Sequence, residues 1–276
     1  MKVSEILNLA YQDIHKDEAK LVLATLLNKN PLELILDLDY QVPDDIKTKY
    51  LECVKNIKNG IPIQYALNST NFFGFDFYVD KRVLIPRFET EELVYNTNIY
   101  LQKYFQNPSI LDLGCGSGCI GLTLKKLDET RKITLLDVSL DALAVARENS
   151  KNLGVDVNFL QSDVFSQVKD KYDVIISNPP YISYQDDVSK IVLDNEPSLA
   201  LYAKDDGLEY YDKILSNCKN YLNDKFLIAF EIGASQKDKV VALINKYLTD
   251  VKIICKKDMS ERDRMIFIFK NININE

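Results

Sequence analysis

The sequence contains no tryptophan, one histidine and five scattered cysteines without a C-x-x-C pair. A structural zinc site or a disulfide framework is therefore not expected, because both need paired or clustered ligands. Free thiols suit a reducing cytoplasm, which is the compartment we expect. No apolar run reaches the roughly 18–20 residues of a membrane helix. Acidic residues at Asp13, Asp17 and Glu18 follow the start too closely for a signal peptide.

Positive charge is also scarce, with 34 Lys and Arg against 41 Asp and Glu and a net charge of −7. Proteins that bind nucleic acid through phosphate contacts usually have the opposite balance. We therefore expect no direct nucleic-acid partner. We also expect no membrane partner and a monomer. The 276 residues include nine Gly, eight Pro and 46% hydrophobic residues, which is ordinary for one large or two smaller folded domains.

Helix signals dominate the first quarter of the chain. Ser4 and Asp17 are candidate N-caps, and Pro31 suits the first turn of a third helix. Pro43 and the acidic pair after it open a fourth helix. We predict a small helical bundle over residues 1–68.

The pattern changes to that of strands in the next segment. Apolar and polar residues alternate over 73–79, which predicts a strand. Residues 80–82 are a turn candidate, and 83–85 are the expected partner strand. We predict a β-hairpin linker over residues 69–85.

Strands and helices alternate through residues 86–276, the third predicted domain. The expected strands cover residues 109–113, 133–137, 157–160, 172–177, 226–232, 251–255 and 265–269. The expected helices cover residues 89–104, 119–126, 141–152, 208–221 and 238–247. This alternation predicts an α/β fold of the Rossmann-like type, with a mostly parallel seven-stranded sheet between helices. Because no helix separates the last two strands, we expect the last strand to be antiparallel.

A glycine-rich loop, Gly114-Cys115-Gly116-Ser117-Gly118, follows the first of these strands. Such a loop before a helix suits a nucleotide-like ligand at the carboxyl edge of the sheet. One interpretation is an NAD site, because residues 116–121 match G-x-G-x-x-G and Asp137 follows about 20 residues later. The other takes Asp112 with the three alternate glycines, which resembles motif I of the class I S-adenosylmethionine-dependent methyltransferases. Asp137 fits both, since a carboxylate there can accept hydrogen bonds from the ribose hydroxyls.

The sequence Asn178-Pro179-Pro180-Tyr181 follows the fourth expected strand and favours the second interpretation. Two prolines stiffen the backbone and hold the Asn178 side chain beside the Pro179 carbonyl. Both are acceptors, so together they can orient an –NH₂ group toward an electrophile. Tyr181 offers an aromatic face to a planar amide or base and to a cation. We predict Asn178, Pro179 and Tyr181 as catalytic residues, with Pro180 completing the substrate site.

Together these motifs resemble the bacterial release factor glutamine methyltransferases, the HemK/PrmC family of protein-(glutamine-N5) methyltransferases. The resemblance covers nearly the whole chain. The matching segments are 17–23, 62–65, 73–75, 83–91, the glycine loop, Asp137, 162–163, 178–181, 195–201, 206–208 and 260–264.

The resemblance implies methyl transfer from S-adenosylmethionine to the glutamine amide nitrogen (N5) in the Gly-Gly-Gln motif of class 1 peptide-chain release factors. S-adenosylhomocysteine would be the product, and no metal is needed. The residues 1–68 would help to bind the protein substrate. The alternatives are a ribosomal-protein glutamine and an exocyclic amine of a nucleic acid.

Further site residues are implied by the same resemblance. The expected cofactor-binding residues are Asp112, Gly114, Cys115, Gly116, Ser117, Gly118, Asp137, Asp163, Val164 and Asn178. Asp163 would accept a hydrogen bond from the adenine amine, and a turn-capping role is the alternative. Arg87 and Glu89 would bind substrate near the mouth of the site, although Glu89 also suits a helix N-terminus.

The chain departs from the family pattern at a few positions. Phe88 stands where the family usually has proline, and Glu261 stands where it usually has glycine. Val164 stands where some members have tryptophan against the adenine. None of these positions belongs to the Asn178–Tyr181 motif.

Overall fold

The computed structural model describes residues 1–274, apart from the side chain of residue 35. Contacts divide the chain into two compact units. The smaller unit holds residues 1–69 and 189–195, and the larger unit holds the rest. The domain limits 1–68, 69–85 and 86–276 stay predictions, and the last two positions lie outside the described residues.

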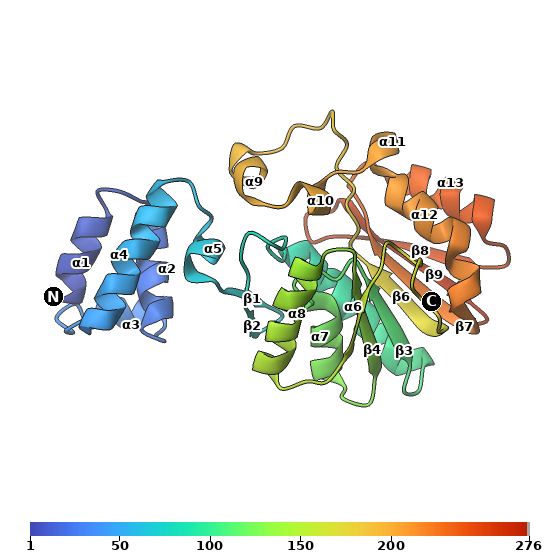
Figure 1. The fold of residues 1–276 in the computed structure, drawn as a ribbon, viewed down its shortest axis with the longest axis horizontal. Helices are drawn as coiled ribbons and strands as arrows, with labels where there is room; N and C mark the ends of the chain where they lie inside the picture. Colours follow the sequence, from blue (N-terminus) through green and yellow to red (C-terminus); the bar gives the residue numbers. More distant parts are fainter. Residues whose placement is uncertain (275–276) are drawn as a thin grey trace. The chain divides into compact units, whose positions relative to one another are not determined.

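The smaller unit is a bundle of short helices around one apolar core (Figure 1). Its helices are α1 (Val3–Ala10), α2 (Lys16–Leu26), α3 (Pro31–Leu36), α4 (Asp44–Lys58), α5 (Ile63–Leu67) and α9 (Lys190–Asn195). The Tyr50 hydroxyl lies in this core and donates to the Ala19 carbonyl at 3.2 Å. The segment α9 returns from far along the chain, and the Asn195 side chain donates to the Gly60 carbonyl at 2.9 Å.

The four predicted helices are confirmed, but the two predicted caps were wrong. Lys2 and His15 occupy the N-cap positions instead. The His15 Nδ1 accepts from the Asp17 amide at 3.3 Å, and Glu18 accepts from the His15 amide at 3.3 Å. This reciprocal arrangement places Asp17 inside the first turn, where its charge suits the helix dipole.

A β-hairpin does lie within residues 69–85, but the predicted pairing of 73–79 with 83–85 around a turn at 80–82 was wrong. Strands β1 (Thr70–Phe72) and β2 (Phe75–Phe77) pair antiparallel, and Phe73-Gly74 forms the turn between them. Both turn residues have positive φ, 54° and 80°, as a tight hairpin turn requires. Residues 83–85 form no strand.

The larger unit contains a seven-stranded sheet in the order β5-β4-β3-β6-β7-β9-β8. The strands are β3 (Ser109–Leu113), β4 (Lys132–Asp137), β5 (Asn158–Gln161), β6 (Tyr172–Ser177), β7 (Leu222–Glu231), β8 (Lys252–Lys257) and β9 (Asp263–Lys270). Strands β3 to β7 are parallel, whereas β9 runs antiparallel to both β7 and β8. The predicted α/β class and the antiparallel last strand are confirmed.

Helices cover both faces of this sheet (Figure 1). One face packs against α6 (Phe88–Tyr104), α7 (Cys119–Leu127) and α8 (Leu140–Leu153), and the other against α12 (Glu209–Asn217) and α13 (Lys237–Tyr247). Successive strand residues alternate between the layers: Val174 and Ile176 belong to the first core, and Ile175 to the second. The short helices α10 (Ser198–Leu201) and α11 (Lys204–Gly207) were not predicted.

The strand order creates a switch point between β3 and β6. From β3 the chain proceeds outward to β4 and β5, and then returns to β6 on the other side of β3. The connections leaving β3 and β6 therefore diverge at the carboxyl edge of the sheet. Open α/β sheets form their ligand crevice at such a point.

One buried asparagine joins three segments near this edge. The Asn149 amide on α8 donates to the Tyr78 and Ser117 carbonyls at 2.9 Å each and accepts from the Tyr78 amide at 2.6 Å. The side chain is fully buried, so no water can replace these bonds. Asn149 therefore fixes the glycine loop against the segment that follows the hairpin.

We predict that Asn149→Ala lowers the free energy of unfolding of the larger unit by about 2–4 kcal/mol, because it leaves buried polar groups unpaired. Urea denaturation followed by circular dichroism measures the change. Asn152→Ala, at an exposed position of the same helix, should change it by less than about 0.5 kcal/mol. Equal effects of the two substitutions would contradict the prediction.

Candidate functional site

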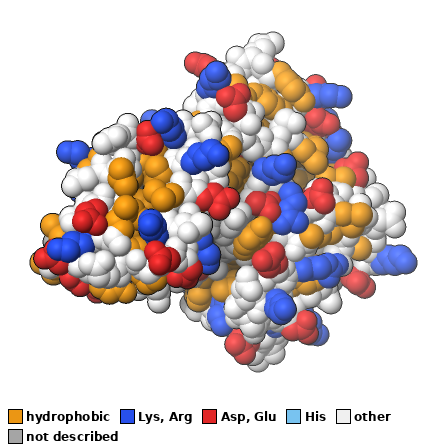
Figure 2. All heavy atoms as spheres, turned by 60° about the vertical axis from the view of Figure 1, so that its left-hand side comes forward, with side chains coloured by type: hydrophobic (Ala, Val, Ile, Leu, Met, Phe, Trp, Pro, Cys, Tyr) orange, Lys and Arg blue, Asp and Glu red, His pale blue; other side chains and the backbone are white. Residues whose placement is uncertain are grey.

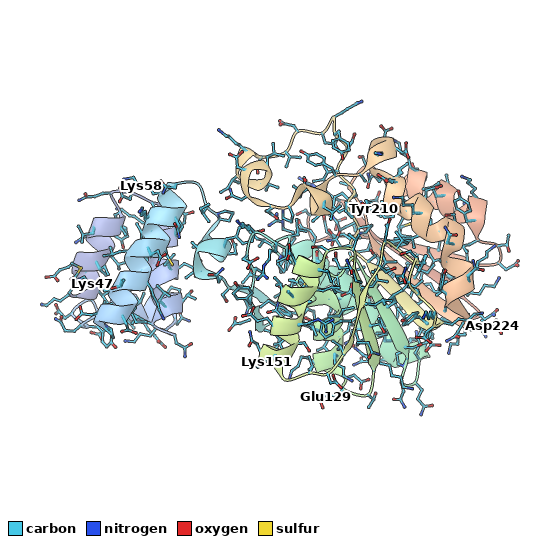
Figure 3. All side chains as sticks on the ribbon, in the orientation of Figure 1. Lys47, Lys58, Glu129, Lys151, Tyr210 and Asp224 are labelled. Carbon is cyan, nitrogen blue, oxygen red and sulfur yellow. The ribbon has the colours of Figure 1, made fainter. Side chains whose placement is uncertain are left out.

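A cavity of about 280 Å³ lies at the carboxyl edge of the sheet, within the larger unit. Its walls come from the loops after β3, β4, β5 and β6, from residues 82–86 and from α12. Tyr210 on α12 lines it, and Figure 3 shows this residue at the opposite end of the sheet from Glu129, which precedes β4. The site therefore occupies the switch point defined by the strand order.

The glycine loop forms one wall of the cavity. Gly114, Cys115, Gly116 and Ser117 line it. The Gly116 backbone is left-handed, with φ of 53°, and a Cβ there would meet no atom within 4 Å. A ligand can therefore approach the main chain directly at this position.

Gly118 does not line the cavity and has a packing role instead. A Cβ at this position would lie 2.9 Å from Leu122 Cδ1 and 3.2 Å from Ala146 Cβ. Its small size allows α7 to begin close to β4 and α8. Cofactor binding by Gly118 stays a prediction.

The two acids predicted beside the loop occupy different environments. Asp137 ends β4 and lines the cavity, where its oxygens accept from the amides of Gly116 and Ser139 at 2.9 Å each. A carboxylate offers about four lone-pair positions, so Asp137 can accept further bonds from a ligand. Burial raises the pKa of this carboxyl despite those amides.

Asp112 lies behind the loop instead of facing the cavity. It is fully buried, and its Oδ2 accepts from the Gly121 amide at 2.8 Å. Burial raises the pKa of Asp112 to about 7. In the structure, Asp112 holds the first turn of α7 against β3 through this hydrogen bond. Direct cofactor binding by Asp112 stays a prediction.

The Asn178 motif forms the opposing wall. Asn178, Pro179 and Pro180 line the cavity directly after β6. The Ser177 hydroxyl donates to the Leu113 carbonyl at 2.6 Å, which ties the end of β6 to the start of the glycine loop. The Asn178 amide nitrogen donates to Thr90 Oγ1 at 3.2 Å. This bond turns the amide nitrogen toward Thr90, so the amide oxygen is the acceptor that Asn178 can offer to a ligand.

A buried carboxylate supports this arrangement. The Thr90 hydroxyl donates to Glu231 Oε2 at 2.7 Å, and the Tyr181 hydroxyl donates to Glu231 Oε1 at 3.2 Å. Glu231 ends β7 and is 1% exposed. Burial raises the pKa of Glu231 to about 7, although Thr90 and Arg264 oppose the shift.

Of the other predicted site residues, some line the cavity and others do not. Asp163 and Val164 line the cavity after β5, as expected of an adenine site, and Val164 has a positive φ of 48°. Tyr181 does not line the cavity, and its hydroxyl donates to Glu231. Its contact with a substrate stays a prediction. Arg87 pairs with the buried Glu196 at 2.5 Å, and neither Arg87 nor Glu89 lines the cavity. Their roles toward a ligand stay predictions.

Two residues of this arrangement, Thr90 and Glu231, were not predicted from the sequence. Glu231 could have been found, since it is a carboxylate at the end of a buried strand that neighbours β6. Thr90 gave no comparable signal, because its position at the cavity depends on how α6 packs against the sheet. Tyr210 and Lys213 also line the cavity without a sequence signal.

Two further observations concern the part of the chain that the structure describes. Within residues 1–274 there is no group of three or more His, Cys, Asp or Glu side chains that could hold a metal ion. In the same residues, every helix is too short or too polar to cross a bilayer.

Family models match most of the chain. The Methyltransferase small domain matches residues 88–195, and the PrmC N-terminal domain matches residues 1–67. The chain is 38% identical over 250 residues to the release factor glutamine methyltransferase of Streptococcus pneumoniae, covering 90% of this chain and 89% of that protein. It is 33% identical over 279 residues to that of Bacillus anthracis, covering 97% and 99%.

The chain belongs to the release factor glutamine methyltransferase family. The predicted resemblance is thereby confirmed, and so is the methyltransferase interpretation over the NAD interpretation.

Solved structures with low sequence identity to this chain share the fold of its larger unit. A methyltransferase from Pyrococcus furiosus superimposes with a TM-score of 0.54 at 20% identity, covering 72% of this chain and 91% of that one. A Thermus thermophilus 16S rRNA methyltransferase, solved with AdoMet and guanosine, gives 0.53 at 13% identity, covering 74% and 50%. At these identities the likeness shows the methyltransferase fold alone.

We predict that Asp137→Ala weakens S-adenosylmethionine binding at least about tenfold, because two hydrogen bonds of about 1 kcal/mol each would be lost. Isothermal titration calorimetry measures the dissociation constant. Asp156→Ala removes the same charge at an exposed position before β5 and should bind normally. Unchanged affinity of folded Asp137→Ala would show that the ribose contact lies elsewhere.

Proposed function

We propose that this chain transfers a methyl group from S-adenosylmethionine to the side-chain amide nitrogen (N5) of the glutamine in the Gly-Gly-Gln motif of class 1 peptide-chain release factors. One observation carries the proposal: Thr90 engages the Asn178 amide nitrogen and leaves the amide oxygen for a ligand, opposite the glycine loop. An acceptor in this place suits a substrate that presents an –NH₂ group. The names of the relatives supply the substrate class.

The cavity walls fit the cofactor. The open backbone at Gly116 admits close approach by the methionine part, and Asp137 has acceptor positions left for ribose hydroxyls. Asp163 and Val164 would hold the adenine. When bound, S-adenosylmethionine supplies a sulfonium methyl group, whose carbon–sulfur bond breaks as the glutamine nitrogen forms its bond to that carbon.

The residues of this chain orient the nitrogen and need not deprotonate it beforehand. The Asn178 oxygen and the Pro179 carbonyl would each accept one N–H of the glutamine amide. That pose turns the nitrogen lone pair out of conjugation and toward the methyl group. Fixed acceptors also stabilise the positive charge that develops on the nitrogen, which then releases one proton to water. Orientation of this kind can lower a barrier by roughly 7–11 kcal/mol.

Surface charge agrees with a protein substrate. On the face shown in Figure 2, basic side chains are interspersed with acidic ones, without a continuous basic field. With a net charge of −7, this distribution disfavours broad phosphate contact. Methylation of a ribosomal protein or a nucleic acid is the alternative that the following assay distinguishes.

We expect the protein to transfer labelled methyl from S-adenosylmethionine to a class 1 release factor, because the amide oxygen of Asn178 and the Pro179 carbonyl fit a glutamine –NH₂. Parallel reactions contain ribosomal protein or duplex DNA. Mass spectrometry of the Gly-Gly-Gln peptide locates the label. A factor with glutamate in place of that glutamine should remain unlabelled, and label found only on ribosomal protein or DNA would overturn the proposal.

Matched variants of this chain accompany the assay. Asn178→Ala should lower kcat at least about 100-fold, through lost orientation, and keep cofactor affinity within about threefold. Asn158→Ala, exposed at the start of β5, should leave both unchanged. Full turnover by Asn178→Ala would contradict the acceptor mechanism.

A further inference from the structure

We propose that Thr90 and Glu231 are positioning residues that set which way the Asn178 amide faces, and that catalysis requires the hydrogen-bond direction that they impose. This inference rests on the proposed function, since it assigns the orientation of the proposed acceptor. It concerns two residues without a direct bond to the reacting nitrogen. Their side chains form a chain of bonds from Glu231 through Thr90 to Asn178.

The direction of these two hydrogen bonds follows from counting the protons that each group can donate. A hydroxyl has one proton and two lone pairs, and an ionised carboxylate only accepts. The Thr90 proton is committed to Glu231 at 2.7 Å, so the group on the other side of Thr90 Oγ1 must be a donor. Asn178 meets that requirement only through its –NH₂ group, which lies 3.2 Å away. Its oxygen is thereby left for the substrate.

Burial of Thr90 and Glu231 fixes the direction of the hydrogen bond between Thr90 and Asn178. Thr90 lines the cavity but is only 3% exposed, and Glu231 is 1% exposed, so a mismatched pair of these buried groups would be costly. Asn and Gln amides otherwise present oxygen or nitrogen with little difference in shape. Without the hydrogen bond to Thr90, Asn178 could present its –NH₂ group to the substrate –NH₂ group. Two donors would then face each other, and no acceptor would orient the nitrogen.

Protonation of Glu231 would reverse the donor and acceptor roles in the hydrogen bonds from Glu231 through Thr90 to Asn178. The new proton on Oε2 would be donated to Thr90, and the Thr90 proton would turn to Asn178. Asn178 would then have to present its oxygen to Thr90 and its –NH₂ group to the substrate. Methyl transfer therefore requires the ionised form of Glu231. This form is lost as pH falls through the pKa of Glu231, which is about 7 in the protein without ligands.

Several groups surround Glu231 and set this balance. Arg264 on β9 favours the ionised form, whereas Glu89 on α6 opposes it. The Tyr181 hydroxyl donates to its side chain, and the Tyr211 hydroxyl on α12 donates to its carbonyl at 2.7 Å. Cys119 on α7 also faces Glu231, and burial keeps that thiol neutral by raising its pKa to about 12.

The test compares Thr90→Val with Thr90→Ser. Valine keeps the shape and removes the hydroxyl, so kcat toward the release factor should fall about 10–100-fold while KM and cofactor affinity stay within about threefold. Serine keeps the hydroxyl and should retain kcat within about threefold. Thr97→Val is the matched control: Thr97 is fully buried on the same helix, and its hydroxyl has no partner among the described residues.

The pH profile supplies a readout that a purely structural role would not move. Wild-type kcat should fall on the acid side with an apparent pKa near 7. Glu231→Gln should lower kcat by at least about tenfold and abolish that limb. Wild-type kcat in Thr90→Val, or an unchanged acid limb in Glu231→Gln, would overturn the proposal.

A second readout does not depend on turnover. The side-chain amide resonances of Asn178 should titrate with pH in the wild type and stop titrating in Glu231→Gln. Resonances that do not titrate in the wild type would overturn the positioning proposal even if methylation is normal. Absence of release factor methylation by the wild type would instead refute the proposed function, so the two failures are distinguishable.

Discussion

An amide side chain must present its oxygen, and not its nitrogen, for the site to recognise an –NH₂ group. The two ends of Asn178 have nearly the same shape, so packing alone selects neither. In the structure the selection comes from a hydrogen bond to Thr90, whose own proton is committed to Glu231. The stiff Asn178-Pro179-Pro180 backbone places the acceptor, and the buried hydroxyl and carboxylate set its direction.

The sheet makes these contacts possible between residues far apart in the sequence. Strands β3, β4, β6 and β7 all end at one edge, which places the glycine loop, Asp137 and Asn178 around one crevice and the buried Glu231 behind Thr90. The alternation of strand residues into two cores keeps the sheet covered on both faces. The remaining opening is at the switch point, where the loops can diverge without exposing strand edges.

Much of the site could be predicted because its residues lie directly after buried strands. The glycine loop and Asn178 each combine a strand signal with turn residues of restricted geometry, and the sequence shows both locally. Thr90 and Glu231 lie 141 residues apart and meet only through the packing of α6 on β7, which no local pattern encodes. The predicted hairpin was misplaced because Phe73, expected to begin a strand, adopts positive φ and forms the turn with Gly74. Glu261 also has positive φ, 61°, a backbone conformation that favours glycine, which is the residue that the family resemblance led us to expect there.

The most direct test of this account is a crystal structure of the protein with S-adenosylhomocysteine and a peptide that contains Gly-Gly-Gln. We predict that the glutamine amide nitrogen lies within about 3 Å of both the Asn178 side-chain oxygen and the Pro179 carbonyl. The Asn178 nitrogen should remain bonded to Thr90. A glutamine bound away from Asn178, or an Asn178 that presents its nitrogen to the peptide, would contradict the account.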